Sequence, residues 1–136
     1  MSFEVTPIGY IHSTLKFRRN APRQGWKGGP DVRLQVLPQY VECLDGVAAG
    51  QDIWVFTWLH QADRETFKVH PGHDPANPIT GVFATRSPDR PNPIGLHRSK
   101  VLSIDGDGWL QVEAIEAIDG TPVIDLKPVL EACADL

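Results

Sequence analysis

Hydrophobic and polar residues alternate along much of this chain with the period of two that is typical of β-strands. Residues 32–36 and 109–115 show this alternation, and residues 5–12 are extended and partly alternating. Residues 53–59 are almost continuously apolar, which predicts a strand buried on both faces. Further strands are expected at residues 79–85, 96–104 and 122–126.

Turns and one short helix separate these strands. Pro38 precedes a short helical candidate at residues 39–44, and the Asp-Gly-Asp-Gly sequence of residues 105–108 predicts a hairpin turn. Residues 64–77 are polar and contain Pro71-Gly72, so an exposed loop is expected there. The pattern predicts an all-β, mainly antiparallel fold: a small closed or partly open β-barrel with one short helix, since barrel closure hides strand edges.

Length and composition narrow the class of protein. The 136 residues are expected to form a single domain, residues 1–136. No apolar stretch has the length of a membrane span, no secretory signal is visible, and Cys43 and Cys133 do not make a disulfide framework. A cytoplasmic protein without a membrane partner is therefore expected.

The charge balance bears on binding to nucleic acids. The formal net charge is -4, whereas nucleic-acid-binding domains usually carry an excess of positive charge. Local RNA binding stays open because five basic residues gather near the N-terminus, although a solvated basic loop explains them as well. These residues are Lys16, Arg18, Arg19, Arg23 and Lys27.

The most distinctive chemistry lies in residues 85–95, which read TRSPDRPNPIG and are called the proline-rich segment below. Three prolines so close together make a stiff loop that is neither a helix nor a central strand. Arg86 and Arg90 are therefore expected to project from a rigid framework, which suits a site for an anion or a polar ligand. A rigid surface turn with solvated arginines is the alternative.

The same region carries a family resemblance. Residues 81–97, GVFATRSPDRPNPIGLH, resemble the signature of the TsaA-like, or TrmO, family of S-adenosylmethionine-dependent methyltransferases. Four other stretches agree with the family in the same order: residues 7–13, 21–25, 58–61 and 119–128. The resemblance covers nearly the whole chain. It implies a β-barrel methyltransferase, typically a homodimer, that binds S-adenosyl-L-methionine without a Rossmann-type fold.

The resemblance also implies four walls of a site for the methyl donor. Arg86 is expected to pair bidentately with the carboxylate of the donor, and Glu116 or Asp119 to accept hydrogen bonds from its ribose hydroxyls or amino group. Without the resemblance, His60 would be read as a strand cap and Gln61 as a surface amide. The residues assigned to the four walls are Pro22, Arg23 and Gln24; His60 and Gln61; Arg86 and Leu96; and Ile115 and Glu116.

The methyl acceptor is less constrained. An exocyclic adenine nitrogen is a weak nucleophile, so transfer to it needs a carboxylate or histidine to take the proton, unless the substrate already has an acidified N–H. The candidates are Asp119, Asp125 and His97, and the sequence does not choose among them. Asp119-Gly120 is also a turn signal, and Asp125 and Lys127 share one face of a strand, where an ion pair is the alternative.

Some residues depart from the family pattern. The family's best-known activity is N6-methylation of threonylcarbamoyladenosine in tRNA, by enzymes with an extra C-terminal region, so this chain resembles a short form. Asp89 stands where the family loop often has an aromatic residue, and His97 where it often has a serine. An acidic residue in this loop would weaken attraction to a phosphate backbone. The resemblance implies a tRNA or RNA adenosine as the acceptor, and a small-molecule acceptor is the other possibility. The alternative is a non-catalytic module that binds S-adenosylmethionine or RNA.

A third hypothesis rests on residues 70–74. His70, His73 and Asp74 form a His-x-x-His pattern with a nearby carboxylate, which could bind a divalent metal in a hydrolase. Pro71-Gly72 between the histidines argues against helical ligand geometry. No metal site is assigned.

Overall fold

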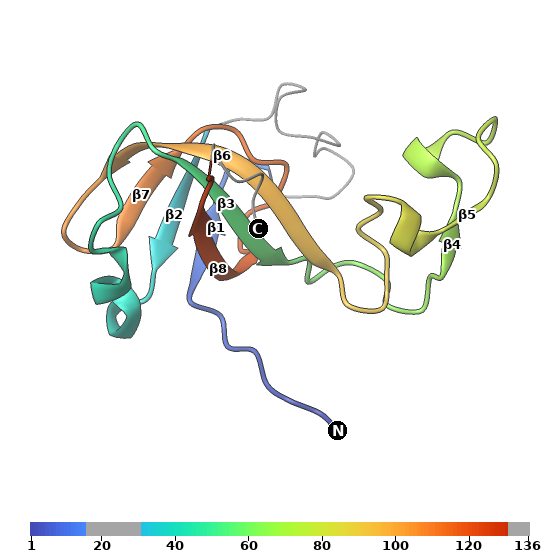
Figure 1. Cartoon of the computed structure of the whole chain (residues 1–136), viewed down its shortest axis with the longest axis horizontal. Coiled ribbons are helices and arrows are strands. Elements are labelled where there is room, and N and C mark those ends of the chain that lie inside the picture. The colour runs from blue at the N-terminus through green and yellow to red at the C-terminus, as the bar shows by residue number, and fades with distance from the viewer. Residues whose placement is uncertain (16–30, 131–136) are drawn as a thin grey trace.

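The structure, a computed structural model, describes residues 1–15 and 31–130 (Figure 1). Six antiparallel strands close into a barrel in the order β1-β2-β7-β6-β3-β8, which confirms the predicted fold class. Pro22, Arg23, Gln24 and the basic N-terminal cluster lie outside the described residues, as does Cys133. The barrel strands are β1 (Gly9–His12), β2 (Val32–Val36), β3 (Asp52–Trp58), β6 (Ile94–Ile104), β7 (Trp109–Val112) and β8 (Pro122–Pro128).

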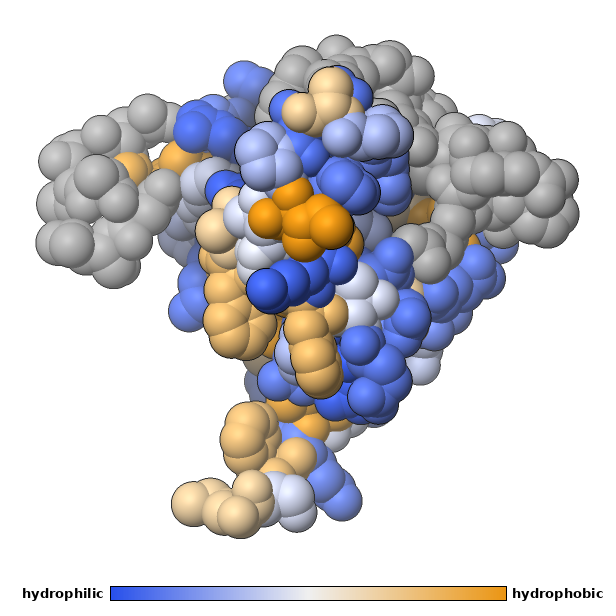
Figure 2. Space-filling model, turned by 90° about the vertical axis from the view of Figure 1, so that its right-hand side faces the viewer, coloured by the Kyte–Doolittle hydropathy of each residue, from blue (hydrophilic) through white to orange (hydrophobic). Residues whose placement is uncertain are grey.

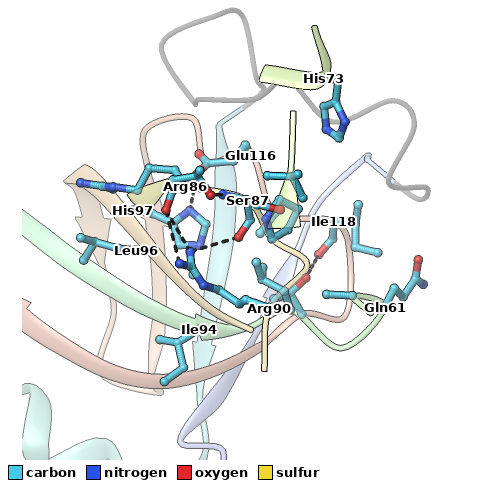
Figure 3. A pocket seen from close by; sticks show the side chains of 18 of the residues that line it. Gln61, His73, Arg86, Ser87, Arg90, Ile94, Leu96, His97, Glu116 and Ile118 are labelled. Carbon is cyan, nitrogen blue, oxygen red and sulfur yellow. Dashed lines mark hydrogen bonds and ion pairs between the residues drawn. The ribbon is translucent and has the colours of Figure 1, made fainter. Parts of the chain in front are cut away.

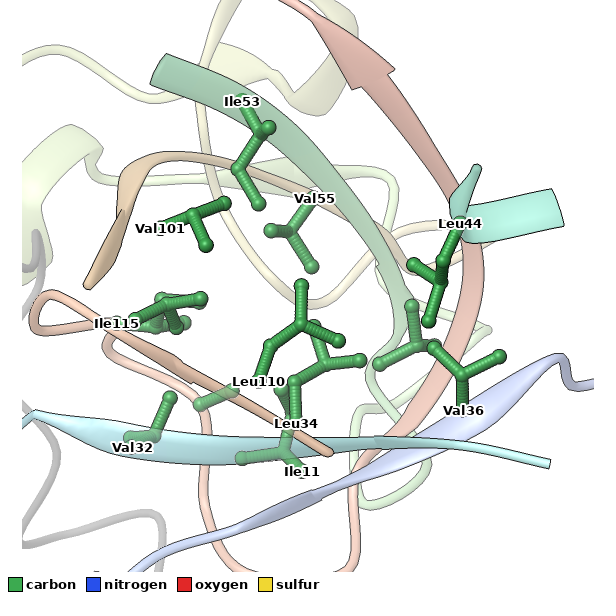
Figure 4. Close-up of a cluster of buried hydrophobic side chains, with 13 residues drawn as sticks. Ile11, Val32, Leu34, Val36, Leu44, Ile53, Val55, Val101, Leu110 and Ile115 are labelled. Atoms are coloured by element: carbon green, nitrogen blue, oxygen red, sulfur yellow. The ribbon is translucent and has the colours of Figure 1, made fainter. Parts of the chain in front are cut away.

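Apolar side chains from every barrel strand fill its interior (Figure 4). Leu34, Val55 and Leu110 are almost completely buried at its centre, as the alternation of their strands requires. Leu44, from the 3₁₀ helix η3 (Pro38–Leu44), and Ile115, from the β7–β8 connection, lie at opposite ends of this cluster (Figure 4). The predicted short helix is therefore present as η3, and it closes one end of the core.

The prediction that residues 53–59 form a strand buried on both faces is wrong, because the outer face of β3 is only partly covered. Its burial alternates strictly: Ile53, Val55 and Thr57 are buried, whereas the outward-facing aromatic residues are only partly covered. The guanidinium carbon of Arg98 lies 5.9 Å from the ring centroid of Trp54. The continuous apolar run therefore combines a core face with an outer aromatic face.

Residues 59–93, called the arm below, connect β3 to β6 and stand to one side of the barrel (Figure 1). Since β3 and β6 pair directly with each other, the arm is an excursion from one end of this strand pair. It carries exposed hydrophobic side chains, Phe67, Ile79 and Phe83, and Figure 2 shows apolar side chains gathered on this face of the molecule. Its elements are β4 (Lys68–Val69), η4 (Pro71–His73), β5 (Thr80–Gly81) and η5 (Val82–Ala84).

The prediction of a strand at residues 79–85 is wrong, apart from the two residues of β5. The chain turns into η5 instead, where Val82 is 3% exposed and Phe83 is 85% exposed. The hydroxyl of Thr85 donates to the carbonyl of Val82 over 2.9 Å and so caps this turn. The loop predicted at residues 64–77 likewise contains β4, the pairing partner of β5.

Two strand ends also differ from the sequence pattern. β1 begins at Gly9, and the preceding Phe3 and Val5 are 83% and 55% exposed. β7 ends at Val112, after which the chain leaves the sheet to place Ile115 in the core. Within residues 1–15 and 31–130, no helix has both the length and the hydrophobicity that a membrane crossing would need.

Candidate functional site

A cavity of about 710 Å³ lies between the arm and the adjacent end of the barrel. This volume falls within the range of roughly 300–1,000 Å³ that is typical of small-molecule sites. Residues from four segments line the cavity: residues 59–62 after β3, residues 69–73, residues 85–88, 90 and 94–97, and residues 116–118 and 121. The arm and the barrel therefore both contribute side chains to the cavity wall, among them Arg86 and Gln61 from the arm and His97 from β6 (Figure 3).

Arg90 holds the proline-rich segment in shape from within. Its Nη2 donates to the carbonyl of Val82 over 2.6 Å, and its Nη1 donates to the carbonyl of Ser87 over 3.1 Å. Both nitrogens also approach the carbonyl of Thr85 at 3.3 Å. The expectation that both arginines project outward is therefore wrong for Arg90, because its guanidinium donates hydrogen bonds to backbone carbonyl groups of the same loop.

Both arginines line the cavity, but Arg86 is exposed whereas Arg90 is only partly exposed. No hydrogen bond or ion pair joins its side chain to residues 1–15 or 31–130. A guanidinium presents a planar fork of donors that matches a carboxylate. Arg86 is thus the cavity-lining arginine that can take an anion from a ligand.

A second set of bonds fixes the proline-rich segment to the chain that follows β3. Arg64 donates through Nε to the carbonyl of Pro91 over 2.7 Å, and through Nη2 to the side-chain oxygen of Asn92 over 2.9 Å. The backbone N–H of Asp63 donates to the carboxylate of Asp89 over 2.8 Å. Asp89, which departs from the family pattern, thus has a local structural role. Prolines and these bonds together make the cavity wall rigid.

His97 and Glu116 form a polar pair at the boundary between the barrel interior and the cavity. The Nδ1 atom of His97 lies 2.8 Å from Oε1 of Glu116, and its Nε2 atom lies 2.7 Å from the hydroxyl of Thr57. The His97 side chain is 3% exposed and that of Glu116 is 19% exposed. Among the described residues that line the cavity, Glu116 carries the only carboxylate.

The structure gathers most of the predicted donor-site residues around this cavity. Arg86, Leu96, His97 and Glu116 lie on one side of it in Figure 3, and Gln61 lies on the other. The exposed His60 also lines the cavity, but Ile115 does not, because its side chain is 0% exposed in the barrel core. The predicted donor-site residues that line the cavity are His60, Gln61, Arg86, Leu96 and Glu116, and the candidate base His97 also lines it.

The two aspartates proposed as bases lie outside the cavity lining. The carboxylate of Asp119 accepts a hydrogen bond from the backbone N–H of Ser13 over 3.0 Å, which joins the β7–β8 connection to the end of β1. Asp125 lies on the exposed part of β8, with its carboxylate 3.9 Å from the ammonium of Lys127. The Asp125–Lys127 contact is the ion pair that the sequence offered as an alternative, whereas the bond between Asp119 and Ser13 was not expected from the sequence.

Several lining residues were missed by sequence reasoning. Ile94 and Ile118 add apolar surface, and Thr85 and Ser87 add hydroxyls within the proline-rich segment. His73 lines the cavity from the arm and has a left-handed backbone with φ of 57°. Ile94, Thr85 and Ser87 lie within or beside the recognised motif, which is a usable signal, whereas nothing in the local sequence marks Ile118.

The suggested metal ligands do not converge. His70 Nδ1 lies 2.8 Å from the carbonyl of Asn77, and the carboxylate of Asp74 accepts the backbone N–H of Ala76 over 2.9 Å. Within the part of the chain that the structure describes, no three histidine, cysteine, aspartate or glutamate residues form a group suited to a metal ion. These polar side chains instead stabilise the turn that carries η4.

A closed antiparallel barrel whose end and inserted arm enclose a ligand-sized cavity defines a β-barrel ligand-binding domain, distinct from the α/β nucleotide-binding folds. The model of the tRNA-methyltransferase O N-terminal domain matches residues 10–135. The chain belongs to this family, which confirms the resemblance drawn from its motifs.

Individual relatives agree with the family match. The chain is 37% identical over 131 residues to a "Probable S-adenosyl-L-methionine-binding protein" of Methanothermobacter thermautotrophicus, covering 96% of this chain and 93% of that protein. It is 36% identical over 121 residues to an "S-adenosyl-L-methionine-binding protein" of Archaeoglobus fulgidus, covering 89% of this chain and 85% of that protein.

Solved structures show the same fold. The crystal structure of TrmO from Pseudomonas aeruginosa is similar with a TM-score of 0.76 and 34% identity, over 100% of this chain and 60% of that chain. A further TrmO crystal structure also gives a TM-score of 0.76, with 35% identity and coverage of 62% of that chain. The chain therefore spans less than two thirds of these TrmO chains.

Proposed function

We propose that the protein is an S-adenosyl-L-methionine-dependent methyltransferase whose donor site is the cavity between the arm and the barrel. The observation that carries this proposal is the meeting of residues from separate segments around one cavity. Gln61, Arg86 and Glu116 are far apart in the sequence and line the same space. The resemblance had assigned all three to the walls of a donor site.

The described residues fit the chemical groups of this donor. S-adenosyl-L-methionine supplies an electrophilic methyl group on a sulfonium, together with a carboxylate, an ammonium group, a ribose and an adenine. Arg86 offers a guanidinium that makes no hydrogen bond or ion pair with the described residues and can bind the carboxylate, and Glu116 offers an acceptor for hydroxyl or ammonium hydrogens. Leu96, Ile94 and Ile118 supply apolar surface that excludes water from part of the cavity.

For the acceptor, we propose a tRNA or RNA adenosine or a related amine, and the protein is expected to act as a homodimer in the cytoplasm. Family membership supports the RNA acceptor, since the matching model describes a tRNA-methyltransferase domain. A non-catalytic donor-binding module is the second candidate, because the archaeal relatives are named as binding proteins rather than methyltransferases. A small-molecule acceptor is a further outcome of the same test.

Calorimetric titration of the purified chain with S-adenosyl-L-methionine and then S-adenosylhomocysteine tests the donor site. Saturable binding near one ligand per chain is expected. Absence of binding to folded, ligand-free protein would remove the methyltransferase proposal. Transfer of a labelled methyl group to bulk tRNA, to other RNA and to a metabolite pool then separates an enzyme from a binding module, which would bind the donor and transfer nothing. Sedimentation equilibrium measures whether the chain is a dimer.

A further inference from the structure

Three side chains form a continuous hydrogen-bonded chain from the barrel interior to the cavity. Thr57 is 0% exposed on β3 and contacts Nε2 of His97 on β6 at 2.7 Å. Nδ1 of His97 contacts Glu116 at 2.8 Å, and Glu116 lines the cavity. His97 is therefore buried between a hydroxyl that faces the core and a carboxylate that faces the ligand space.

The hydrogen-bond partners of Thr57, His97 and Glu116 indicate which of their atoms carry protons. An ionised carboxylate only accepts hydrogen bonds, so with Glu116 ionised the Nδ1 atom of His97 is the donor to Glu116. In the neutral ring, Nε2 then has no proton and accepts the hydroxyl hydrogen of Thr57. Both ring nitrogens are satisfied, and His97 has no free lone pair facing the cavity. This arrangement does not suit the base that would take a proton from a methyl acceptor, a role considered for His97 from the sequence.

The backbone leaves room for this contact. Thr57 pairs with Gly95 across β3 and β6, and Val55 pairs with His97. A Cβ atom at Gly95 would overlap Oγ1 of Thr57 and lie 2.7 Å from Nε2 of His97. The glycine of the proline-rich segment therefore provides space for the His97–Thr57 hydrogen bond, which in turn sets the orientation of the imidazole ring.

We propose that His97 is a positioning residue that fixes the carboxylate of Glu116 toward the cavity as an acceptor for donor groups of the bound ligand. The inference rests on the proposed function for the identity of that ligand. Thr57 orients the ring, the ring orients Glu116, and the second carboxylate oxygen stays available to the ligand. Loss of the His97–Glu116 bond lets the carboxylate rotate, which lowers its contribution to ligand binding.

Two amide substitutions separate the two bonds of His97. In His97→Asn, the side-chain nitrogen lies close to the place of Nδ1 and preserves a donor for Glu116. In His97→Gln, the amide reaches toward the place of Nε2 and the donor for Glu116 is lost. Dissociation constants for S-adenosyl-L-methionine are measured by calorimetry for both variants, for Glu116→Gln and for the double variant His97→Gln/Glu116→Gln. His12→Gln is the control, because His12 lies on the outer face of β1, in contact with Gln35.

The expected pattern differs from that of a merely structural histidine. His97→Asn should bind within about threefold of the unmodified protein, whereas His97→Gln and Glu116→Gln should each bind about tenfold more weakly. The double variant should bind no more weakly than Glu116→Gln alone, because both changes remove the same contact. Equal losses for Asn and Gln, or additive losses in the double variant, would overturn the assignment.

Nitrogen-15 shifts of the imidazole ring provide a second measurement that needs no ligand. The unmodified protein should show a His97 ring that carries a proton at Nδ1, and Glu116→Gln should alter this signal. A ring protonated at Nε2 alone would refute the positioning role even if the donor binds. Conversely, an Nδ1-protonated ring in a protein that binds no donor would preserve the His97–Glu116 assignment and reject the proposed function.

Discussion

Gly95 lies directly opposite Thr57 in the β3–β6 pairing, and the missing side chain of Gly95 gives the ring of His97 its place. The hydroxyl of Thr57 and Nε2 of His97 are 2.7 Å apart in that space. A residue that looks like the last part of a turn motif in the sequence is therefore a packing requirement of the site.

Replacement of Gly95 by alanine is predicted to destabilise the protein. The added methyl group would overlap Thr57 and crowd His97, and overpacking of this kind costs about 1–3 kcal/mol. Urea unfolding measures the change in free energy of unfolding. Gly106→Ala is the control, because no atom lies within 4 Å of a Cβ built there. If the two variants unfold at the same urea concentration, the packing argument is wrong.

Replacement of Arg86 by alanine is predicted to weaken donor binding without unfolding the protein. Hydrogen bonds to charged groups contribute about 1.5–3 kcal/mol, so the dissociation constant should rise at least about tenfold. Calorimetry gives the affinity and a thermal scan gives the folded state. Arg33→Ala is a matched control, since Arg33 is exposed and lies over the Trp109 ring on the outer face of the barrel. Unchanged affinity in Arg86→Ala would exclude this residue from the donor site.

Replacement of Arg90 by lysine is predicted to lower stability although the charge is kept. Lysine has no planar fork with which to reach the carbonyls of Val82 and Ser87 together. The expected loss is about 1–3 kcal/mol in urea unfolding. Arg86→Lys, at a position without such bonds, should change stability by less than about 0.5 kcal/mol. Equal effects at the two positions would contradict the internal role of Arg90.

Replacement of Asp125 by asparagine is predicted to change neither stability nor methyl transfer measurably. Its contact with Lys127 joins side chains that are 55% and 63% exposed, and such surface pairs contribute little. Asp125 also lies outside the cavity lining. A large loss of methyl transfer at unchanged donor affinity would restore Asp125 as a candidate base.

The barrel was predictable because its strands show their buried faces in local alternation, as in residues 32–36 and 109–112. The strand expected at residues 79–85 failed for a physical reason. Val82 and Phe83 look like part of an apolar run, yet the fold of η5 depends on hydrogen bonds from Thr85 and Arg90. Those bonds form only within the folded loop, and they are not reflected in any regular alternation of apolar and polar residues in the sequence.

The site was predictable only in part. Arg86 and Leu96 lie in or beside a recognisable motif, so they could be assigned to a wall of the cavity. The Thr57–His97 contact spans 40 positions and the His97–Glu116 contact spans 19. Strand register and the path of the β7–β8 connection determine both contacts. Neither is encoded in local sequence, so His97 was grouped with Asp119 and Asp125 rather than with Glu116.

The position of the arm has a consequence for how this fold can diversify. Residues 59–93 leave and rejoin the barrel at the same end of two strands that pair directly with each other. Barrel closure therefore does not depend on the length or content of this insertion, whereas the shape of the cavity does. Such a scaffold can exchange one wall of its pocket, and with it the range of molecules it admits, while the architecture that supports folding is inherited unchanged.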